Sequence, residues 1–96
     1  MKIYLKSRIG ILKDLYNQPF KSYPYQIALR TRMTPYVIYR ELKKMKSEGL
    51  ICISKEERHQ NPQQRKKYYK LTPEGKKLAE LFYKIEEIYK LLPLKN

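Results

Sequence analysis

The sequence has too few of the residues that build disulfide frameworks, membrane spans or common catalytic motifs. Its 96 residues include a single cysteine, Cys52, which excludes an intramolecular disulfide and a cysteine-rich zinc site. The three glycines form no phosphate-binding loop, and the sequence contains no HExxH motif and no Ser/His/Asp or Cys/His set. Every apolar run is far shorter than the roughly 20 residues of a membrane-spanning helix. We therefore expect neither an enzyme nor a membrane protein.

Signals for metal binding and for secretion are also missing. His59 is the only histidine, and no second nitrogen or thiolate ligand lies at a useful spacing. The N-terminal segment MKIYLKSRIGIL carries a charge every few residues and lacks a small-residue cleavage site, which argues against a secretory signal. The sequence therefore predicts a cytoplasmic protein without metal or other cofactor, associated with the nucleoid if it binds DNA.

Acidic residues are scarce, and the resulting positive charge is unevenly distributed. The chain has 22 Lys and Arg against 9 Asp and Glu, for a formal charge of +13. Residues 1–33 carry seven basic and one acidic residue (+6), residues 34–71 ten and four (+6), and residues 72–96 five and four (+1). This asymmetry predicts a surface that faces a polyanion and a C-terminal segment with a separate role. Nucleic acid is the first candidate for the polyanion, and an anionic membrane surface is the second.

Two amphipathic helices are expected before residue 33. Residues 4–17 carry apolar side chains at steps of three and four, and Pro19, which lacks an amide proton, ends this helix. A shorter helix is expected to begin near Ser22 as its N-cap, with Pro24 in its first turn. The side chains expected to face the core are Leu5, Ile9, Leu12, Leu15 or Tyr16, and then Ile27, Ala28 and Leu29.

The clearest boundaries enclose a helix over residues 35–48. Thr34 is a good N-cap, Pro35 suits the first helical position, and Gly49 follows the last turn as a C-terminal cap. At about 100° per residue, one side of this helix is apolar and the opposite side is basic and aromatic. The apolar side has Ile38, Leu42 and Met45, and the opposite side has Tyr36, Arg40, Lys43 and Ser47, flanked by Tyr39 and Lys44.

A β-hairpin and a long helix are expected to follow. The apolar segment 50–53, LICI, predicts a short strand, and residues 66–71, KKYYKL, predict its partner. The polar segment 57–65, ERHQNPQQR, predicts the loop between them. Thr72 is expected to cap a helix over residues 73–92, which Pro93 stops. Three helices, a hairpin and a further long helix form the order of a winged helix, although the strand that usually lies between the first helices has no clear place here.

Residues 34–78 resemble the MarR and PadR families of transcriptional regulators. The segments that carry the resemblance are TPYVIYRELKKMKSEGLI (34–51) and RKKYYKLTPEGKKL (65–78). The resemblance implies a winged helix-turn-helix fold, mainly α with a small β-hairpin (α+β), as one domain over 1–96. Within it we expect a DNA-binding core over 1–71, a wing near 54–67 and a C-terminal dimerisation helix over 73–92. The chain is too short for most of the helices that build a MarR ligand pocket, and its wing tip, HQNPQQ, lacks the acidic residue paired with arginine. A PadR-like or minimal archaeal or viral regulator is nearer, and a viral regulator would act in the host cytoplasm.

The same resemblance implies contacts with double-stranded DNA through helix 35–48 in the major groove and the wing, 57–67, at the minor groove. Arg40 is the first candidate for contacting a guanine, and its alternative role is as a surface residue or a partner of Glu41 or Glu48. Tyr39 could instead pack against the wing. The residues expected to contact DNA are Thr34, Tyr36, Tyr39, Arg40, Lys43, Lys44, Arg58, Arg65, Lys66 and Lys67, with Lys43 and Lys44 on phosphates and Arg65 first in the wing.

The C-terminal helix carries a broad apolar stripe that predicts a homodimer. Its other face is a nearly neutral mixture of lysine and glutamate, so two basic protomers could approach there. Two-fold symmetry then predicts a pseudo-palindromic DNA site with half-sites about 34–36 Å apart. The alternative is a helix folded onto its own core. The stripe residues are Leu78, Leu81, Phe82, Ile85, Ile88, Tyr89 and Leu92.

Several alternatives to a sequence-specific regulator stay open at this stage. The same basic face could coat duplex DNA without sequence preference, as an architectural protein does. A winged helix could also bind protein within a larger assembly, through Tyr36, Tyr39 and the wing. RNA fits less well, because an A-form major groove is too narrow for this helix. Cys52 is expected to be a buried apolar residue, with a redox role as its alternative, and the sequence names no effector.

Overall fold

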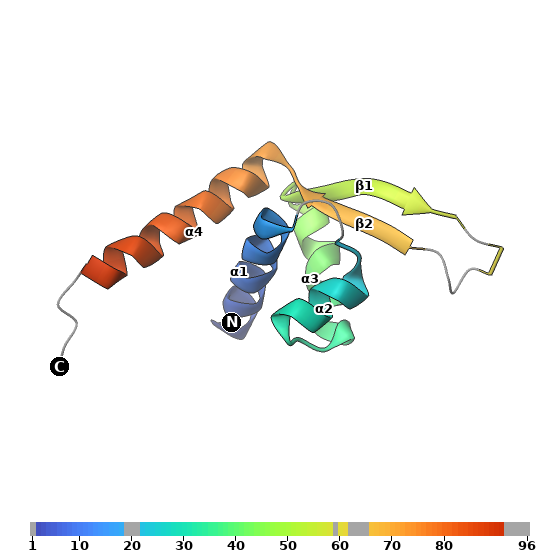
Figure 1. The fold of residues 1–96 in the computed structure, drawn as a ribbon, viewed down its shortest axis with the longest axis horizontal. Helices are drawn as coiled ribbons and strands as arrows, with labels where there is room; N and C mark the ends of the chain where they lie inside the picture. Colours follow the sequence, from blue (N-terminus) through green and yellow to red (C-terminus); the bar gives the residue numbers. More distant parts are fainter. Residues whose placement is uncertain (1, 19–21, 59, 62–65, 92–96) are drawn as a thin grey trace.

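The computed structural model describes residues 2–18, 22–58, 60–61 and 66–91, with the side chains of residues 2–5 left aside. The order of its elements is that of a winged helix-turn-helix, as predicted. The elements are α1 (Lys2–Asn17), α2 (Pro24–Thr31), α3 (Pro35–Ser47), β1 (Ile51–Glu57), β2 (Lys66–Leu71) and α4 (Pro73–Leu91). Helices α1, α2 and α3 form a bundle, the hairpin projects from one side of it, and α4 runs away on the other side (Figure 1).

The predicted caps of α3 are confirmed. The Thr34 hydroxyl accepts a hydrogen bond from the Val37 amide at 3.3 Å, and Pro35 occupies the first turn. Gly49 has a φ of 78°, the left-handed conformation that glycine adopts without steric cost after a helix. The buried side chains of α3 include the three predicted apolar residues, Ile38, Leu42 and Met45, together with Glu41, which the apolar pattern does not predict.

The prediction that Pro24 lies in the first turn of α2 is confirmed, whereas the prediction of Ser22 as its N-cap is wrong. The N-cap position belongs to Tyr23, which makes no side-chain cap, and Pro24 starts the helix by its fixed φ. The Ser22 hydroxyl instead donates to the carbonyl of Gln18 at 2.5 Å. Ile27 and Ala28 are buried as predicted. Leu29, which was expected to face the core, is 61% exposed, because so short a helix turns only one narrow side inward.

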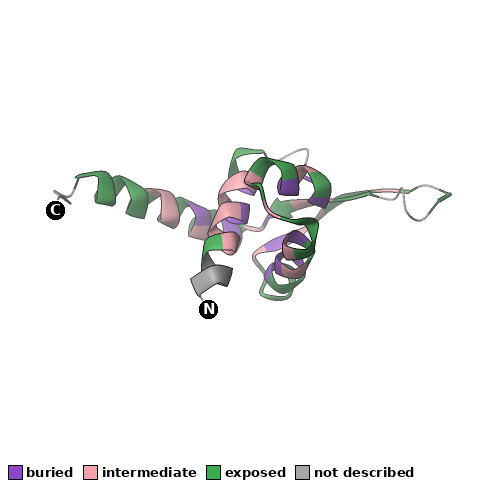
Figure 2. Cartoon of the chain, turned by 90° about the horizontal axis from the view of Figure 1, so that it is seen from below, coloured by how far each residue is buried: buried purple, intermediate pink, exposed green. Residues whose placement is uncertain are grey.

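Helix α1 supplies three of the buried core residues, as many as α3 does. Leu12 and Leu15 are buried as predicted, and Ile11, which the periodicity does not single out, is buried beside them. Ile9 is half-buried, and Tyr16 is 37% exposed because its hydroxyl reaches a partner on α4. The expected core position at residue 5 lies outside the described side chains. The buried residues gather where α1, α3 and the hairpin base meet (Figure 2).

The hairpin is longer than the sequence predicts. Strand β1 extends to Glu57, and its antiparallel pairing with β2 runs from Ile51 opposite Leu71 to Glu57 opposite Lys66. The register shifts between Ile53 and Lys55, which marks a β-bulge. Among the described residues the sheet has two strands. Where a winged helix usually has a third strand, the described residues make one backbone hydrogen bond to β2, from the Tyr69 amide to the Ser22 carbonyl at 2.8 Å.

Helix α4 starts against the turn that follows α3. The Thr72 hydroxyl accepts from the Gly75 amide at 3.1 Å, as the predicted cap requires, and donates to the Gly49 carbonyl at 2.6 Å. A β-carbon at Gly75 would lie 2.0 Å from the Leu50 carbonyl oxygen, so this close approach requires glycine. Gly75 and Ala79 are the buried residues of α4, and the helix then leaves the body of the protein with most of its surface exposed (Figures 1 and 2). None of the described helices is long and apolar enough to span a membrane.

Candidate nucleic-acid interface

The basic and aromatic side of α3 lies on the surface. Tyr36 is 73% exposed and Tyr39 is 60% exposed, and both retain enough accessible surface to contact another molecule. Lys43 and Lys44 are exposed one turn further along, and Thr34 is exposed at the N-terminal end. The N-terminal half of α3 therefore presents hydroxyl, aromatic and cationic groups to solvent, with its apolar side buried against the bundle.

Arg40 lies in the middle of this surface but is held from two sides. Its guanidinium carbon is 5.7 Å from the centre of the Tyr36 ring, within the range of a cation–π contact. Its Nε is 3.5 Å from a carboxylate oxygen of Glu41, so the alternative role as a partner of Glu41 is present in the structure. The side chain as a whole is 28% exposed, while its Nε is buried.

Glu41 and Glu48 bind the same residue of α1. Arg8 donates from Nε and Nη2 to Glu41 Oε1 at 3.3 Å each, and from Nη1 to Glu48 Oε1 at 2.6 Å. The Glu41 side chain is fully buried, whereas that of Glu48 is 45% exposed. Sequence reasoning named Glu41 as a possible partner of Arg40 but missed its burial and its link to Arg8. A signal for the burial exists, because Glu41 lies three residues after Ile38 and four before Met45, on the apolar side of the helix.

Residues of β2 contact Tyr23, at the start of α2. Lys66 Nζ lies 4.7 Å from the centre of the Tyr23 ring, and Tyr23 meets Tyr68 edge to face with ring centres 5.3 Å apart. Lys55 Nζ lies 5.6 Å from the centre of the Tyr68 ring on the opposite strand. These contacts restrain the hairpin relative to the helix-turn-helix, so the wing and α3 are held in one arrangement.

The cations expected in the wing are exposed where the structure describes them. Arg58, Lys66 and Lys67 all lie on the surface, and the predicted contact at residue 65 falls outside the described residues. Glu56 and Glu57 stand opposite Lys67 and Lys66 in the register, which reduces the net positive charge of the strands.

The tyrosine pair of β2 is engaged in packing. Tyr69 packs against the core, and burial raises its pKa, with smaller contributions from Tyr39 and Glu56. Tyr39 therefore lies close to β2 while its own side chain stays largely exposed. Tyr68 is half-buried in its contact with Tyr23.

Arg32 is a cationic residue of this region that the sequence did not single out. It is exposed in the turn between α2 and α3 and adopts a left-handed conformation, with φ of 60°. Its neighbour Arg30 instead turns inward to Asp14 of α1, with bonds of 2.8 and 3.0 Å. Arg32 could have been included among the candidate DNA contacts because it lies two residues before Thr34 in the sequence.

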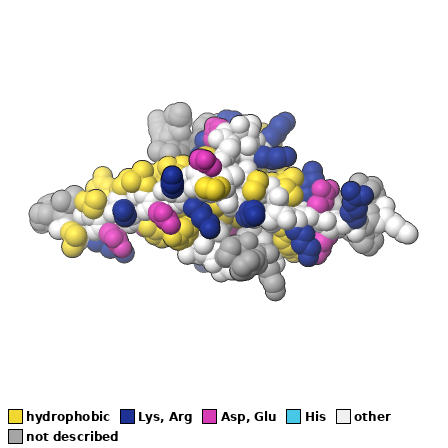
Figure 3. Space-filling view, turned by 90° about the horizontal axis from the view of Figure 1, so that it is seen from above, with side chains coloured by type: hydrophobic (Ala, Val, Ile, Leu, Met, Phe, Trp, Pro, Cys, Tyr) yellow, Lys and Arg dark blue, Asp and Glu magenta, His cyan; other side chains and the backbone are white. Residues whose placement is uncertain are grey.

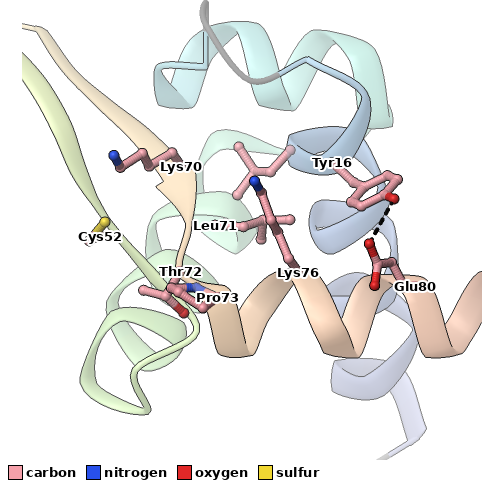
Figure 4. A pocket seen from close by; sticks show the side chains of 9 residues that line it. Tyr16, Cys52, Lys70, Leu71, Thr72, Pro73, Lys76 and Glu80 are labelled. Carbon is pink, nitrogen blue, oxygen red and sulfur yellow. Dashed lines mark hydrogen bonds between the residues drawn. The ribbon is translucent and has the colours of Figure 1, made fainter.

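A groove lies between the hairpin base, the end of α1 and the first turns of α4 (Figure 4). Cys52 lines it in a half-buried position opposite Lys70, rather than buried as expected. At its far end the Tyr16 hydroxyl donates to Glu80 at 3.1 Å, and this bond raises the Tyr16 pKa. The groove lies apart from the exposed surface of α3.

Comparisons with known proteins agree with the fold. The family model for the transcriptional regulator PadR-like family matches residues 22–81. A PadR family transcription regulator from hypervirulent Clostridium difficile R20291 is 31% identical, covers 85% of this chain and 90% of its own, and superposes with a TM-score of 0.68. No curated protein matches the chain significantly.

Other solved structures share the same fold. The S. aureus MepR–DNA complex superposes with a TM-score of 0.71 at 24% identity, over 88% of this chain and 59% of MepR. A putative DNA-binding protein from Ralstonia eutropha JMP134 is 22% identical, with a TM-score of 0.64, over 81% of this chain and 95% of its own. The family match spans more than half of the sequence and includes α2, α3, the hairpin and the start of α4. The chain belongs to the PadR-like family of transcriptional regulators.

Proposed function

We propose that this protein is a sequence-specific regulator of transcription that binds double-stranded DNA, with α3 in the major groove and the wing at the adjacent minor groove. The observation that carries the proposal is the exposed basic and aromatic side of α3 beside a wing whose described cations are also exposed. MepR, which shares the fold, was crystallised with DNA, which supports the same mode of binding. The formal charge of +13 favours a polyanionic partner.

The proposed contacts divide by chemistry. Arg40 is assigned to a guanine, because a guanidinium can bond O6 and N7 of that base together. Lys43 and Lys44 are assigned to phosphates, which fix the position of the helix without discriminating sequence. Thr34 and Tyr36 are assigned to the groove entry, and Tyr39 to the flank of the helix. Arg58, Lys66, Lys67 and residue 65 are assigned to the wing contacts.

We further propose that the protein acts as a homodimer through α4. Leu78 and Phe82 pack against the protein's own core, but Leu81, Ile88 and Tyr89 are 52%, 57% and 58% exposed, and Ile85 is 38% exposed. Leu78, Leu81, Ile85 and Ile88 recur at steps of three and four, the spacing of a two-stranded coiled coil. Figure 3 shows hydrophobic side chains along the projecting part of α4. The proposed stripe ends at Leu92, which lies outside the described residues.

Helix α1 covers a different side of α4 and leaves this stripe open. Tyr16 bonds Glu80, Asn17 donates to the Tyr83 hydroxyl at 2.7 Å, and Lys13 pairs with Glu86. At about 100° per residue, Tyr83 and Glu86 project more than 90° away from Leu81 and Ile88. A second copy of the chain is the occupant that the near-neutral charge of this segment favours.

Selection of bound duplexes from a random library tests the proposal most directly. A dimeric regulator should enrich one pseudo-palindromic sequence, with half-sites about one duplex turn apart. Its affinity for that sequence should exceed its affinity for scrambled duplex by about 10³ or more. Equal affinity for all duplexes would identify an architectural protein instead. Binding that hardly changes with salt would favour a protein-interaction module.

A further inference from the structure

A fully buried carboxylate lies within the helix that is proposed to enter the major groove. Glu41 is 0% exposed, in a chain whose formal charge is +13. Burial of an ionised carboxylate is costly unless cations or hydrogen-bond donors compensate it. A negative charge on this helix also opposes the approach of phosphates. We explain the presence of Glu41 at this position by the contacts that it makes with neighbouring cations.

The two oxygens of this carboxylate face two different arginines. Oε1 accepts both hydrogen bonds from Arg8 of α1, at 3.3 Å each. Oε2 accepts no hydrogen bond and lies 3.5 Å from Nε of Arg40. Glu41 therefore bridges the arginine that ties α3 to α1 and the arginine that lies on the exposed side of α3.

The contact with Arg40 requires that side chain to adopt a particular course. Adjacent residues of a helix project about 100° apart and do not normally face each other. Arg40 therefore bends around the helix toward Glu41, while the Tyr36 ring, one turn earlier, lies 5.7 Å from its guanidinium carbon. An arginine so held loses less rotamer freedom when it binds a base than a freely rotating one.

We infer that Glu41 is a positioning residue that orients Arg40 for base recognition from within the protein. The buried carboxylate forms an ion pair with the buried Nε of the guanidinium, without a hydrogen bond, and the Tyr36 ring lies in cation–π range of the same group. Glu41 itself touches no DNA, because its side chain is fully enclosed. This inference rests on the proposed function, since it concerns how the same surface discriminates sequence.

The first test is Glu41→Gln, which keeps the shape of the side chain and removes its charge. We expect preference at the base pair contacted by Arg40 to fall about tenfold in duplex selection. Affinity for scrambled duplex should stay equal or increase, because one negative charge is lost. Glu48→Gln is the matched control: it removes the same charge from an exposed partner of the same Arg8 and should leave base preference unchanged.

A double variant separates positioning from stability. Replacement of a buried ion pair by apolar residues of similar volume is often neutral or stabilising, so Arg8→Met with Glu41→Met should remain folded. This variant should also lose preference at the Arg40 base pair. In a double-mutant cycle, Glu41→Gln should cause no further loss of preference in an Arg40→Ala background, because both changes remove one recognition unit.

The outcomes are distinguishable. Wild-type preference in folded Glu41→Gln, or in the folded methionine variant, overturns the inference. Additive losses in the cycle overturn it as well, because Glu41 would then act elsewhere. If the Arg40→Ala variant keeps every base preference, Arg40 does not recognise a base. The inference about Glu41 then fails, whereas the proposal of duplex binding is unaffected. If the wild-type protein binds no duplex at all, the proposed function itself fails.

Discussion

The salt dependence of duplex binding can be calculated from the exposed cations of the proposed interface. Five of the cations assigned to DNA are exposed: Lys43, Lys44, Arg58, Lys66 and Lys67. Arg40 is counted as a base contact, and residue 65 lies outside the described residues. Each phosphate neutralised by a cation contributes about −0.9 to the slope of log K against log salt concentration. If all five engage phosphates, one protomer gives a slope of about −4.5 and a dimer about −9. The slope therefore shows whether binding depends on phosphate contacts and how many protomers bind.

These slopes correspond to large changes over an accessible range. Between about 50 and 200 mM salt, one protomer should lose about 500-fold in affinity and a dimer about 10⁵-fold. Lys43→Ala with Lys44→Ala should flatten the slope by about 1.8 per protomer, because two phosphate contacts are lost. Fluorescence anisotropy with a labelled duplex, repeated at several salt concentrations, measures both quantities.

A charge-matched control distinguishes contact from general attraction. Lys76 and Lys90 are exposed on α4 and are not among the residues assigned to DNA. Lys76→Ala with Lys90→Ala changes the net charge by the same amount and should leave the slope nearly unchanged. If both double variants flatten the slope equally, the assignment of Lys43 and Lys44 to phosphates is refuted. A slope near zero for the wild-type protein refutes the DNA interface as a whole.

Three further predictions follow from individual residues. Arg40→Ala should weaken specific binding by about 1–3 kcal/mol and relax preference at one base pair, which duplex selection will show. Ile85→Glu with Ile88→Glu should give a monomer in light scattering, because two charges then face each other across the proposed interface; a persistent dimer would place that interface elsewhere. Gly75→Ala should lower the free energy of unfolding by about 1–3 kcal/mol or more, because the new β-carbon would lie 2.0 Å from the Leu50 carbonyl oxygen. Gly49→Ala, at a φ of 78° in open space, should cost only about 1 kcal/mol, and the reverse order of melting temperatures would contradict this packing argument.

The sequence predicted best those elements whose ends have local chemical causes. Thr34 and Gly49 bound α3 as expected, because a hydroxyl cap and a left-handed glycine act within one turn of the chain. Thr72 caps α4 for the same local reason. Ser22 fits the same cap rule but does not act as a cap, because its hydroxyl bonds Gln18 and its carbonyl accepts from Tyr69. Long-range pairing thus replaced the local motif.

The candidate site was predicted only in its exposed part. The opposite sides of α3 follow from helical periodicity alone, so its exposed basic residues could be named. The link from Glu41 to Arg8 joins residues 33 positions apart, and no periodic pattern encodes such a pair. The extension of β1 to Glu57 depends on pairing across the hairpin, which polar residues such as Lys55 and Glu56 do not indicate by themselves.

Helix α1 connects the two surfaces that the proposed function requires. Toward α3 it supplies Arg8, which binds Glu41 and Glu48. Toward α4 it supplies Lys13, which pairs with Glu86, and the ring of Tyr16 lies 5.7 Å from that of Tyr83. In the proposed dimer, the separation of the two α3 helices is therefore fixed by contacts of α1 rather than by a flexible linker. A rigid separation restricts binding to half-sites at one spacing, so the fold itself would discriminate operators by spacing as well as by sequence.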